Sequence, residues 1–528
     1  MADGNVTLLL KRVETAETSL KSLKDNADVF FVLIMAIVIF FMQAGFAFLE
    51  CGSVRSKNTT NILIKNMLDC FISGIAYWGV GYALAFGEPD NFFLGTRYWF
   101  SENMPGDMHF HFWFFHFVFA ATAATIVSGA MAERCEFIAY FAYSFVITGV
   151  VYPIVTHWAW SSSGWLAVGI DGIAYKDFAG SGVVHLLGGT AALVGAILLG
   201  PRIGRFDSID GKPNDIPGHS VPLAALGGFI LMFGFFAFNG GSQASISQPG
   251  DGAAVARAMM NTVICGSFAA FTSMILKKCG LACINCSCGH PSNWSLLVTI
   301  NGALTGMVAA CAGCDVLMPW GACIVGVIAG ITYLFWSWAV QAMKIDDPLD
   351  AVAVHGGGGL WGLIAVPIFK MNDGIIFDPS NVTAWKSLGV NMVGAVAIVG
   401  WTAVICLVLF GILKLCKVLR VNEDIEIKGL DIPKHGEPAY PSEAWGDGWN
   451  SGHLTMHGHV AMNSDSKAIN MSDLEPVVVP KGYVKSPERY QYHGEMNNGQ
   501  LTNRAVFIAK QPGQEYDNAA YTHENTHF

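Results

Sequence analysis

The chain has 528 residues, of which 53% are hydrophobic and only 13% are charged, against about 25% charged residues in soluble domains. Its 15 Trp and 59 Gly are typical of membrane bundles, where aromatic residues anchor at interfaces and glycines let helices approach closely. The formal net charge of −10 says little about partners in such a chain, and no basic patch suggests nucleic-acid binding. The composition indicates a polytopic membrane protein.

Residues 1–28 form a polar N-terminal segment with a regular apolar pattern. Alternating spacings of four and three separate its apolar residues, which are Leu9, Val13, Ala16, Leu20, Leu23 and Ala27. This pattern predicts a short coiled coil, which would imply self-association, or an amphipathic helix lying on the membrane. Both alternatives stay open.

Eleven apolar windows of about 20 residues follow, each long enough to span a bilayer as a helix. They lie at 29–49, 62–86, 110–132, 136–157, 181–200, 220–242, 253–276, 294–312, 319–342, 351–369 and 388–416. We therefore predict an all-α transmembrane domain over 29–416 and a juxtamembrane segment over 417–440. The tail, 441–528, is rich in Asn, Gly, His and Pro and is expected to be largely disordered.

The basic residues of the loops predict the orientation, because cytoplasmic loops carry an excess of Lys and Arg. The loops after the odd-numbered helices hold nine: Arg55, Lys57, Arg134, Arg202, Arg205, Lys212, Lys277, Lys278 and Lys344. The loops after the even-numbered helices hold four: Arg97, Lys176, Lys370 and Lys386. The N-terminus is therefore expected outside the cell and the C-terminus in the cytoplasm.

Two predicted helices share an unusual pattern around a histidine. His185 lies in "DFAGSGVVHLLGGTAAL" and His355 in "DPLDAVAVHGGGGLWGL". Each histidine follows a valine, stands eight residues after an aspartate (Asp177 or Asp347), and precedes Gly-Gly by three and four residues. The two helices are the fifth and the tenth, so the copies face opposite ways across the membrane. This favours an inverted five-plus-five repeat, with a site at the midplane, over chance similarity.

Each histidine alone is explained by packing, as a neutral imidazole bonded to a neighbouring helix. Two at equivalent positions favour a functional site, because ionisable residues within spans are rare. A neutral pair offers hydrogen-bonding edges without charge, which suits a small neutral solute. Desolvation would oppose a hydrated cation there.

Four cysteines crowd the loop "KKCGLACINCSCGH" beside His290: Cys279, Cys283, Cys286 and Cys288. Their spacing is irregular for zinc, so we predict no metal site and favour lipid modification at the membrane edge.

Several stretches together resemble the signature of the ammonium transporter family, the Amt/Mep/Rh proteins. They are "DFAGSGVVHLLGGTAALVGAILLGPR", "FAATAATIVSGAMAER", "AFNGGS", "DDPLDAVAVHGGGG" and "GLDIPKHGEPAY", and the resemblance spans about 29–440. It implies a homotrimer of eleven-helix protomers, each with its own pore between inverted halves. It also implies ammonium or ammonia as substrate, methylammonium as a further candidate, and neither a cofactor nor an enzymatic reaction.

The resemblance also assigns residues to the outer part of the pore. Trp160 matches the vestibule tryptophan that attracts ammonium through its ring face, with Phe238 and Ser242 opposite. Phe115 and Phe119 match the two stacked rings that close the pore below.

Deeper in the pore, His185 and His355 match the family's paired histidines, and Asp177 matches a buried carboxylate that holds backbone groups near the recruitment site. Phe235 departs from the pattern, because bacterial members often have Trp there. Rhesus-type members generally lack the recruiting Trp and Ser, so the resemblance favours the Amt branch, in a plasma membrane.

Alternative functions remain at this point: a Rhesus-like ammonia channel, an ammonium sensor, and an electron-transfer protein whose two histidines bind haem. Sequons on the predicted outer side make Asn5 and Asn381 candidates for glycosylation, whereas those at Asn58, Asn285 and Asn470 lie on the predicted inner side.

Overall fold

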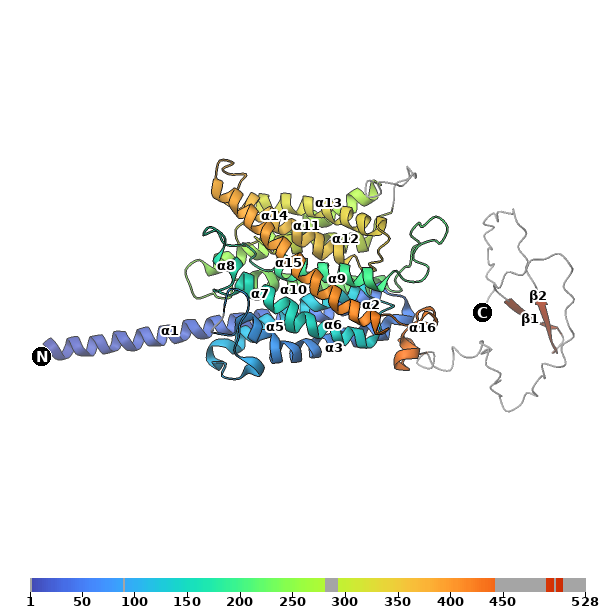
Figure 1. Cartoon of the computed structure of the whole chain (residues 1–528), viewed down its shortest axis with the longest axis horizontal. Coiled ribbons are helices and arrows are strands. Elements are labelled where there is room, and N and C mark those ends of the chain that lie inside the picture. Colours follow the sequence, from blue (N-terminus) through green and yellow to red (C-terminus); the bar gives the residue numbers. More distant parts are fainter. Residues whose placement is uncertain (1, 89–90, 281–292, 442–490, 498–499, 507–528) are drawn as a thin grey trace, which may run out of the picture. The chain divides into compact units, whose positions relative to one another are not determined.

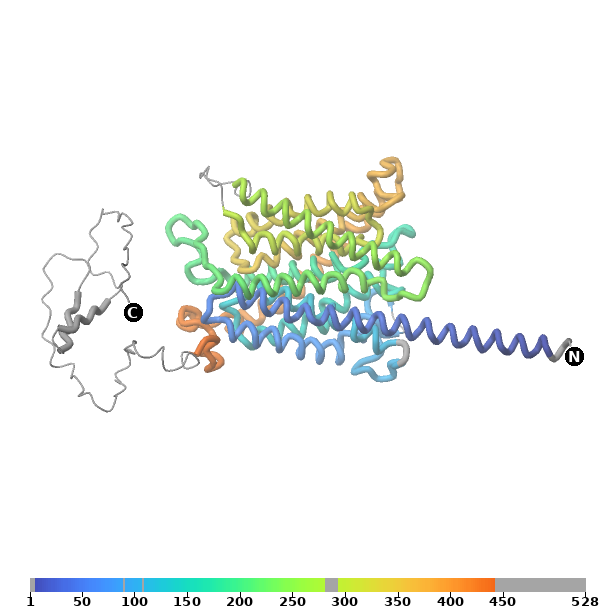
Figure 2. The backbone as a smooth tube through the Cα atoms, turned by 180° about the vertical axis from the view of Figure 1, so that it is seen from behind, coloured from blue at the N-terminus to red at the C-terminus, as the bar shows by residue number. Residues whose placement is uncertain are grey.

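The computed structural model describes residues 2–88, 91–280, 293–441, 491–497 and 500–506. It divides into two units, Met1–Trp445 and Gly446–Phe528. The first unit is a bundle of helices that lie side by side (Figures 1 and 2).

The helices up to the first histidine motif are α1 (Ala2–Phe40), α2 (Met42–Ser53), η1 (Ser56–Asn58), α3 (Thr59–Ala76), η2 (Tyr77–Gly81), α4 (Tyr82–Phe86), η3 (Trp99–Ser101), α5 (Gly106–Ala130), α6 (Phe137–Val146), η4 (Ile147–Val151), α7 (Tyr152–Trp160), α8 (Trp165–Val168), η5 (Ser181–Leu186) and α9 (Leu187–Leu199). The later helices are α10 (Val221–Gly241), α11 (Asp251–Lys278), α12 (Leu296–Ala310), α13 (Pro319–Ala342), η6 (Val352–Gly357), α14 (Gly358–Phe369), α15 (Val382–Leu415), α16 (Glu423–Lys428) and η7 (Asp431–His435).

All eleven predicted spans are helical. Within the described residues, ten helical segments are long and apolar enough to cross a membrane. The eleventh predicted span is the shorter apolar helix α12, of 15 residues. The predicted all-α polytopic fold is therefore confirmed.

Helix α1 extends beyond the predicted first span, which begins at residue 29, into the segment predicted to be a coiled coil or an amphipathic helix. Helix α1 is continuous from Ala2 to Phe40, and α2 follows after a break at Phe41. No Gly or Pro interrupts residues 5–40, so nothing in the sequence stops the transmembrane helix from continuing through the heptad segment. The N-terminal part of α1 projects from the bundle (Figures 1 and 2), and the apolar heptad residues Leu9, Val13, Leu20 and Leu23 are exposed.

The two histidine segments have matching backbone caps. Asp177 Oδ2 accepts from the N–H of Gly182, and Asp347 Oδ2 accepts from the N–H of Val352, each at 2.8 Å and five residues further along the chain. Both segments then form a π-helical turn, η5 or η6, that contains the histidine. Local widening of this kind recurs at functional sites.

The same segments approach each other in a reciprocal way, which explains the shared Gly-Gly. A Cβ added to Gly189 would lie 2.2 Å from the backbone nitrogen of Gly356, the residue after His355. A Cβ added to Gly359 would lie 2.8 Å from the backbone nitrogen of Leu186, the residue after His185. A two-fold relation between inverted repeats produces such an exchange of contacts.

The loops at the predicted inner end meet in a buried ion cluster. Arg202 bridges Glu133, at 3.0 Å, and Asp346, at 2.8 Å, and the three side chains are at most 5% exposed. The juxtamembrane segment packs on the same end, where Asp431 accepts from the backbone N–H groups of Thr60 and Asn61 at the start of α3. Residues 417–440 thus fold with the bundle.

The second unit contains a described hairpin in which β1 (Gln491–Asn497) pairs antiparallel with β2 (Gln500–Val506). These strands are a local exception to the disorder expected over 441–528. The rest of that tail, and the cysteines at 283, 286 and 288, lie outside the described residues.

Candidate functional site

The two repeat histidines meet in the middle of the bundle. The Nδ1 atoms of His185 and His355 lie 3.1 Å apart, a hydrogen-bonding distance, and the ring planes are nearly parallel, with an angle of 14° between them. His185 is fully buried and His355 is 6% exposed. Two imidazoles that share a proton between Nδ1 atoms present polar edges while adding no net charge.

This geometry differs from haem ligation. Two axial histidines would each direct a nitrogen at an iron between them, whereas these rings bond directly to each other.

Aromatic rings cover the His185 side of the pair. The Phe235 ring stacks on His185 with centroids 5.7 Å apart, and the Phe238 ring lies 5.4 Å away. Phe119 then stacks on Phe238 at 4.1 Å. The stacked pair is therefore Phe119 and Phe238, from α5 and α10, whereas the expected pair, Phe115 and Phe119, is tilted by 39° at 4.8 Å.

Above these rings the structure brings together the other expected vestibule residues. The half-buried Trp160 lies edge-on to Phe119 at 6.0 Å. The half-buried Ser242 donates from Oγ to the carbonyl of Phe238 at 2.7 Å, which leaves its oxygen lone pairs free to accept. A Cβ at the adjacent Gly241 would lie 3.6 Å from the Phe115 ring, so the end of α10 faces the same rings.

Asp177 is directed at backbone groups. Its carboxylate accepts from the N–H groups of Gly180 at 3.0 Å, Gly182 at 2.8 Å and Val183 at 3.0 Å. Its carbonyl accepts from the indole N–H of Trp160 at 2.8 Å. Burial raises the pKa of Asp177, and the backbone donors oppose that rise. One residue therefore fixes both the Trp160 ring and the start of η5.

His116 lies beside Trp160 and was not among the site residues predicted from the sequence. Its ring lies 5.9 Å from Trp160 and 4.4 Å from Phe86, and its Nδ1 is buried without a hydrogen-bond partner in the described part of the chain. The signal was available: His116 follows Phe115 directly in the apolar run "FWFFHFVFAA".

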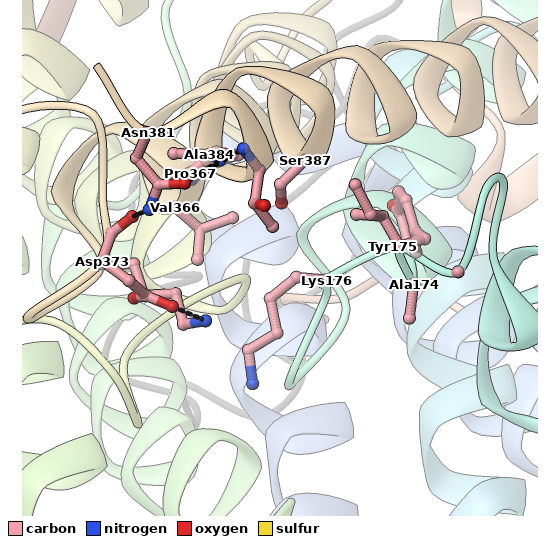
Figure 3. Close-up of a pocket in the computed structure, with 13 residues that line it drawn as sticks. Ala174, Tyr175, Lys176, Val366, Pro367, Asp373, Asn381, Ala384 and Ser387 are labelled. Atoms are coloured by element: carbon pink, nitrogen blue, oxygen red, sulfur yellow. Dashed lines mark hydrogen bonds and ion pairs between the residues drawn. The ribbon is translucent and has the colours of Figure 1, made fainter. Parts of the chain in front are cut away.

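A separate cavity of about 340 Å³ lies beside the loop that carries Asp177. Tyr175 and Lys176 line one side and the start of α15 lines the other (Figure 3). The sequon residue Asn381 is at its edge and caps α15, because its Oδ1 accepts from the N–H groups of Thr383 and Ala384. His185 and His355 do not line this cavity.

Comparison with known proteins identifies the fold and the family. Residues 29–440 match the Ammonium Transporter Family. The chain is 50% identical to "Putative ammonium transporter 1" of Caenorhabditis elegans over 446 residues, which cover 81% of each chain. It is 38% identical to "Ammonium transporter Amt2" of Archaeoglobus fulgidus, over 83% of this chain and 94% of that one.

Among solved structures, the "Sensor Amt Protein" matches with a TM-score of 0.71 and 32% identity, over 79% of this chain and all of that chain. With most of its length matched, and with relatives this similar, the chain belongs to the ammonium transporter family.

Proposed function

We propose that this ammonium transporter captures the ammonium ion at the Trp160 vestibule, removes a proton there, and conducts ammonia past His185 and His355. The observation that carries this proposal is the direct 3.1 Å contact between two buried imidazoles beneath stacked aromatic rings. A dry, neutral, hydrogen-bonding path favours ammonia and opposes hydrated cations, whose desolvation is costly.

Capture depends on the open faces of the vestibule. The Trp160 ring attracts a cation by about 0.5–2 kcal/mol. Ser242 Oγ accepts a hydrogen bond from ammonium, while the rings of Phe115 and Phe119, with Phe238 stacked on Phe119, exclude water below. Asp177 acts through position, because its oxygens are occupied by backbone donors. Phe235 and Phe238 form the wall beside His185.

The transporter is a homotrimer in the plasma membrane, with its N-terminus outside and its C-terminus inside. Its orientation rests on the loop charges. Self-association through α1 is supported by the straight projection of that helix, whose exposed apolar heptad residues would pack in a coiled coil. The same projection argues against a helix lying flat on the membrane.

Asn5 and Asn381 are the glycosylation sites that fit this orientation. Asn5 is exposed on α1. Asn381 uses one Nδ2 hydrogen to bond the carbonyl of Asp373 at 3.1 Å, which leaves the other for the glycosidic bond.

An ammonium sensor is a second candidate function, because one structural relative is named a sensor. A Rhesus-like ammonia channel is less well supported, since Trp160 and Ser242 are both in place at the vestibule. Methylammonium, which keeps the cationic ammonium head, is a candidate second substrate.

The test is growth of a strain without ammonium uptake on scarce ammonium, together with labelled-nitrogen uptake per surface protein. We expect the wild-type chain to restore both growth and uptake. A chain that reaches the surface without restoring uptake would contradict the transport function and would favour the sensor function.

A further inference from the structure

Two buried carboxylates take no part in the pathway described above. Glu50, in α2, is 1% exposed and Asp69, in α3, is fully buried, and both lie within helical segments of the structure that are long and apolar enough to cross a membrane. Neither forms an ion pair in the described part of the structure, and the buried Lys65 donates to the carbonyl of Cys135 instead. Ionisable groups inside a membrane are costly and mark functional paths.

Hydroxyl and amide groups from neighbouring helices surround both carboxylates. Asp69 accepts from Thr125 Oγ1 at 2.5 Å and from Ser144 Oγ. Glu50 accepts from Asn66 Nδ2 at 2.9 Å and from Ser128 Oγ. Hydroxyl groups both donate and accept, so they can pass a proton by reorienting.

The two carboxylate sites lie next to each other on the same two helices. Asn66 and Asp69 are three residues apart on α3, as are Thr125 and Ser128 on α5, so each pair lies on one helix face within about one turn. Beyond Asp69, the Ser144 carbonyl accepts from Thr148 Oγ1. The Thr148 hydroxyl lies 3.3 Å from that of Ser73. We call this set the polar column; its members are Gln43, Glu50, Asn66, Asp69, Ser73, Thr125, Ser128, Ser144 and Thr148.

The column runs from the depth of the aromatic rings to the predicted inner end. A Cβ at Gly74, next to Ser73, would lie 3.7 Å from the ring of Phe117, between the two vestibule phenylalanines on α5. At mid-depth, Gln43 Oε1 is 2.9 Å from Thr125 Oγ1. Gln43 also stands one turn from Phe46, whose ring is 6.2 Å from His355.

Unused hydrogen-bonding atoms remain inside the column. Gln43 Nε2 and Asn66 Oδ1 belong to side chains that are at most 5% exposed, and neither atom has a partner among the described residues. If these groups served only to join helices, both atoms would be expected to have hydrogen-bond partners. An open donor and an open acceptor beside carboxylates allow the network to change its pairing when a proton arrives.

We propose that the polar column takes up the proton that ammonium loses and passes it inward, separately from ammonia. This rests on the proposed deprotonation at the vestibule. One N–H bond of ammonium breaks and its electron pair stays on nitrogen as ammonia leaves through the histidine pair. The proton bonds to a carboxylate oxygen of Asp69, which becomes a neutral acid. Transfer towards Glu50 and release at the inner end restore the carboxylate.

The experiment reconstitutes the full chain in liposomes and measures charge movement and labelled-nitrogen uptake on the same vesicles. Asp69→Asn keeps the shape but removes the proton acceptor, and Thr125→Val removes the hydroxyl that contacts it. Thr122→Val is the matched control: Thr122 is equally buried on α5 and bonds its own helix, to the Val118 carbonyl at 2.8 Å.

We expect the charge moved per nitrogen to fall about tenfold in Asp69→Asn and in Thr125→Val, an effect of roughly 1.4 kcal/mol, and to be unchanged in Thr122→Val. Nitrogen uptake should fall as a pH gradient builds up. A weak-acid protonophore, which carries protons through lipid, should restore it, whereas it cannot repair a misfolded or blocked pore.

Two results would overturn the proton role: a wild-type ratio of charge to nitrogen in Asp69→Asn, or an uptake defect that the protonophore does not relieve. If the wild-type chain moves nitrogen without charge, the column fails as a proton path and transport stands. If the wild-type chain moves no nitrogen, the proposed function itself fails.

Discussion

The histidine pair and the ion cluster at the predicted inner end are both buried, but the first is a pair of uncharged rings and the second is a set of paired charges. At the pore, His185 and His355 bond each other among aromatic rings. At the inner end, Arg202 is fully charged and lies between Glu133 and Asp346. A buried charge is tolerated when it is paired, and a path for a neutral solute is selective when it offers no such pairing.

Under the proposed function, the ion cluster holds the fold and the histidine pair sets selectivity. Damage to the ion cluster should change how much folded protein exists. Damage to the pore should change what each folded molecule transports.

The largest effect is expected from Arg202→Met, which leaves two buried carboxylates without their shared partner. Breaking a buried pair in this way costs about 3–5 kcal/mol of the free energy of unfolding. Thermal unfolding in detergent should show a strongly destabilised protein, while uptake per remaining molecule stays normal. Lys212→Met removes an exposed cation paired with Asp210 and should leave the thermal stability nearly unchanged, because water screens an exposed ion pair. Equal losses of thermal stability in Arg202→Met and Lys212→Met would contradict the role of the buried cluster in holding the fold.

Acid should weaken the same cluster. The pKa of Asp346 falls from 3.8 to about 2, because contacts with Arg202 and the nearby Arg134 outweigh its burial. A lowered folded pKa means that the charged form stabilises the protein above about pH 4 and that this contribution is lost as pH falls towards 2. The shift corresponds to about 2 kcal/mol. The melting temperature of Asp346→Asn should therefore depend less on pH across this range than that of the wild type.

At the pore, His185→Ala and His355→Ala should alter selectivity more than abundance. Each change removes a polar edge and opens space for water, which lowers the barrier to hydrated cations. Discrimination against potassium should fall on the order of tenfold, equivalent to about 1.4 kcal/mol, and ammonium-dependent current should decrease. Wild-type flux and selectivity per surface molecule in both variants would assign these histidines to packing.

The sequence predicted the bundle well because long apolar windows and a repeated His and Gly-Gly pattern are local signals. It placed the start of the first membrane span at residue 29, because hydropathy indicates which residues can contact lipid. Hydropathy does not indicate where the helix itself begins, and α1 begins at Ala2. It also paired Phe115 with Phe119, because spacing on one helix is visible in sequence. The stack of Phe119 on Phe238 joins α5 to α10, and that contact depends on tertiary packing. His116 and the polar column were missed because the partners of these polar side chains lie on other helices. Those partners become visible only when the helices are packed together.

The most specific effect is expected at Trp160, in the proposed site of cation capture. Trp160→Leu removes the ring that attracts ammonium and should raise the half-saturation concentration about 2- to 30-fold, as a loss of about 0.5–2 kcal/mol implies. Maximal flux should change less.

Trp160→Phe sharpens this test, because it keeps an aromatic face but loses the indole N–H that bonds the Asp177 carbonyl. If ring attraction dominates, Trp160→Phe lies between the wild type and Trp160→Leu in half-saturation. If both variants are equally impaired, the indole bond that fixes the loop before η5 matters more than the ring. An unchanged half-saturation concentration in Trp160→Leu would remove this residue from capture and leave cation recognition to Ser242 and the neighbouring rings.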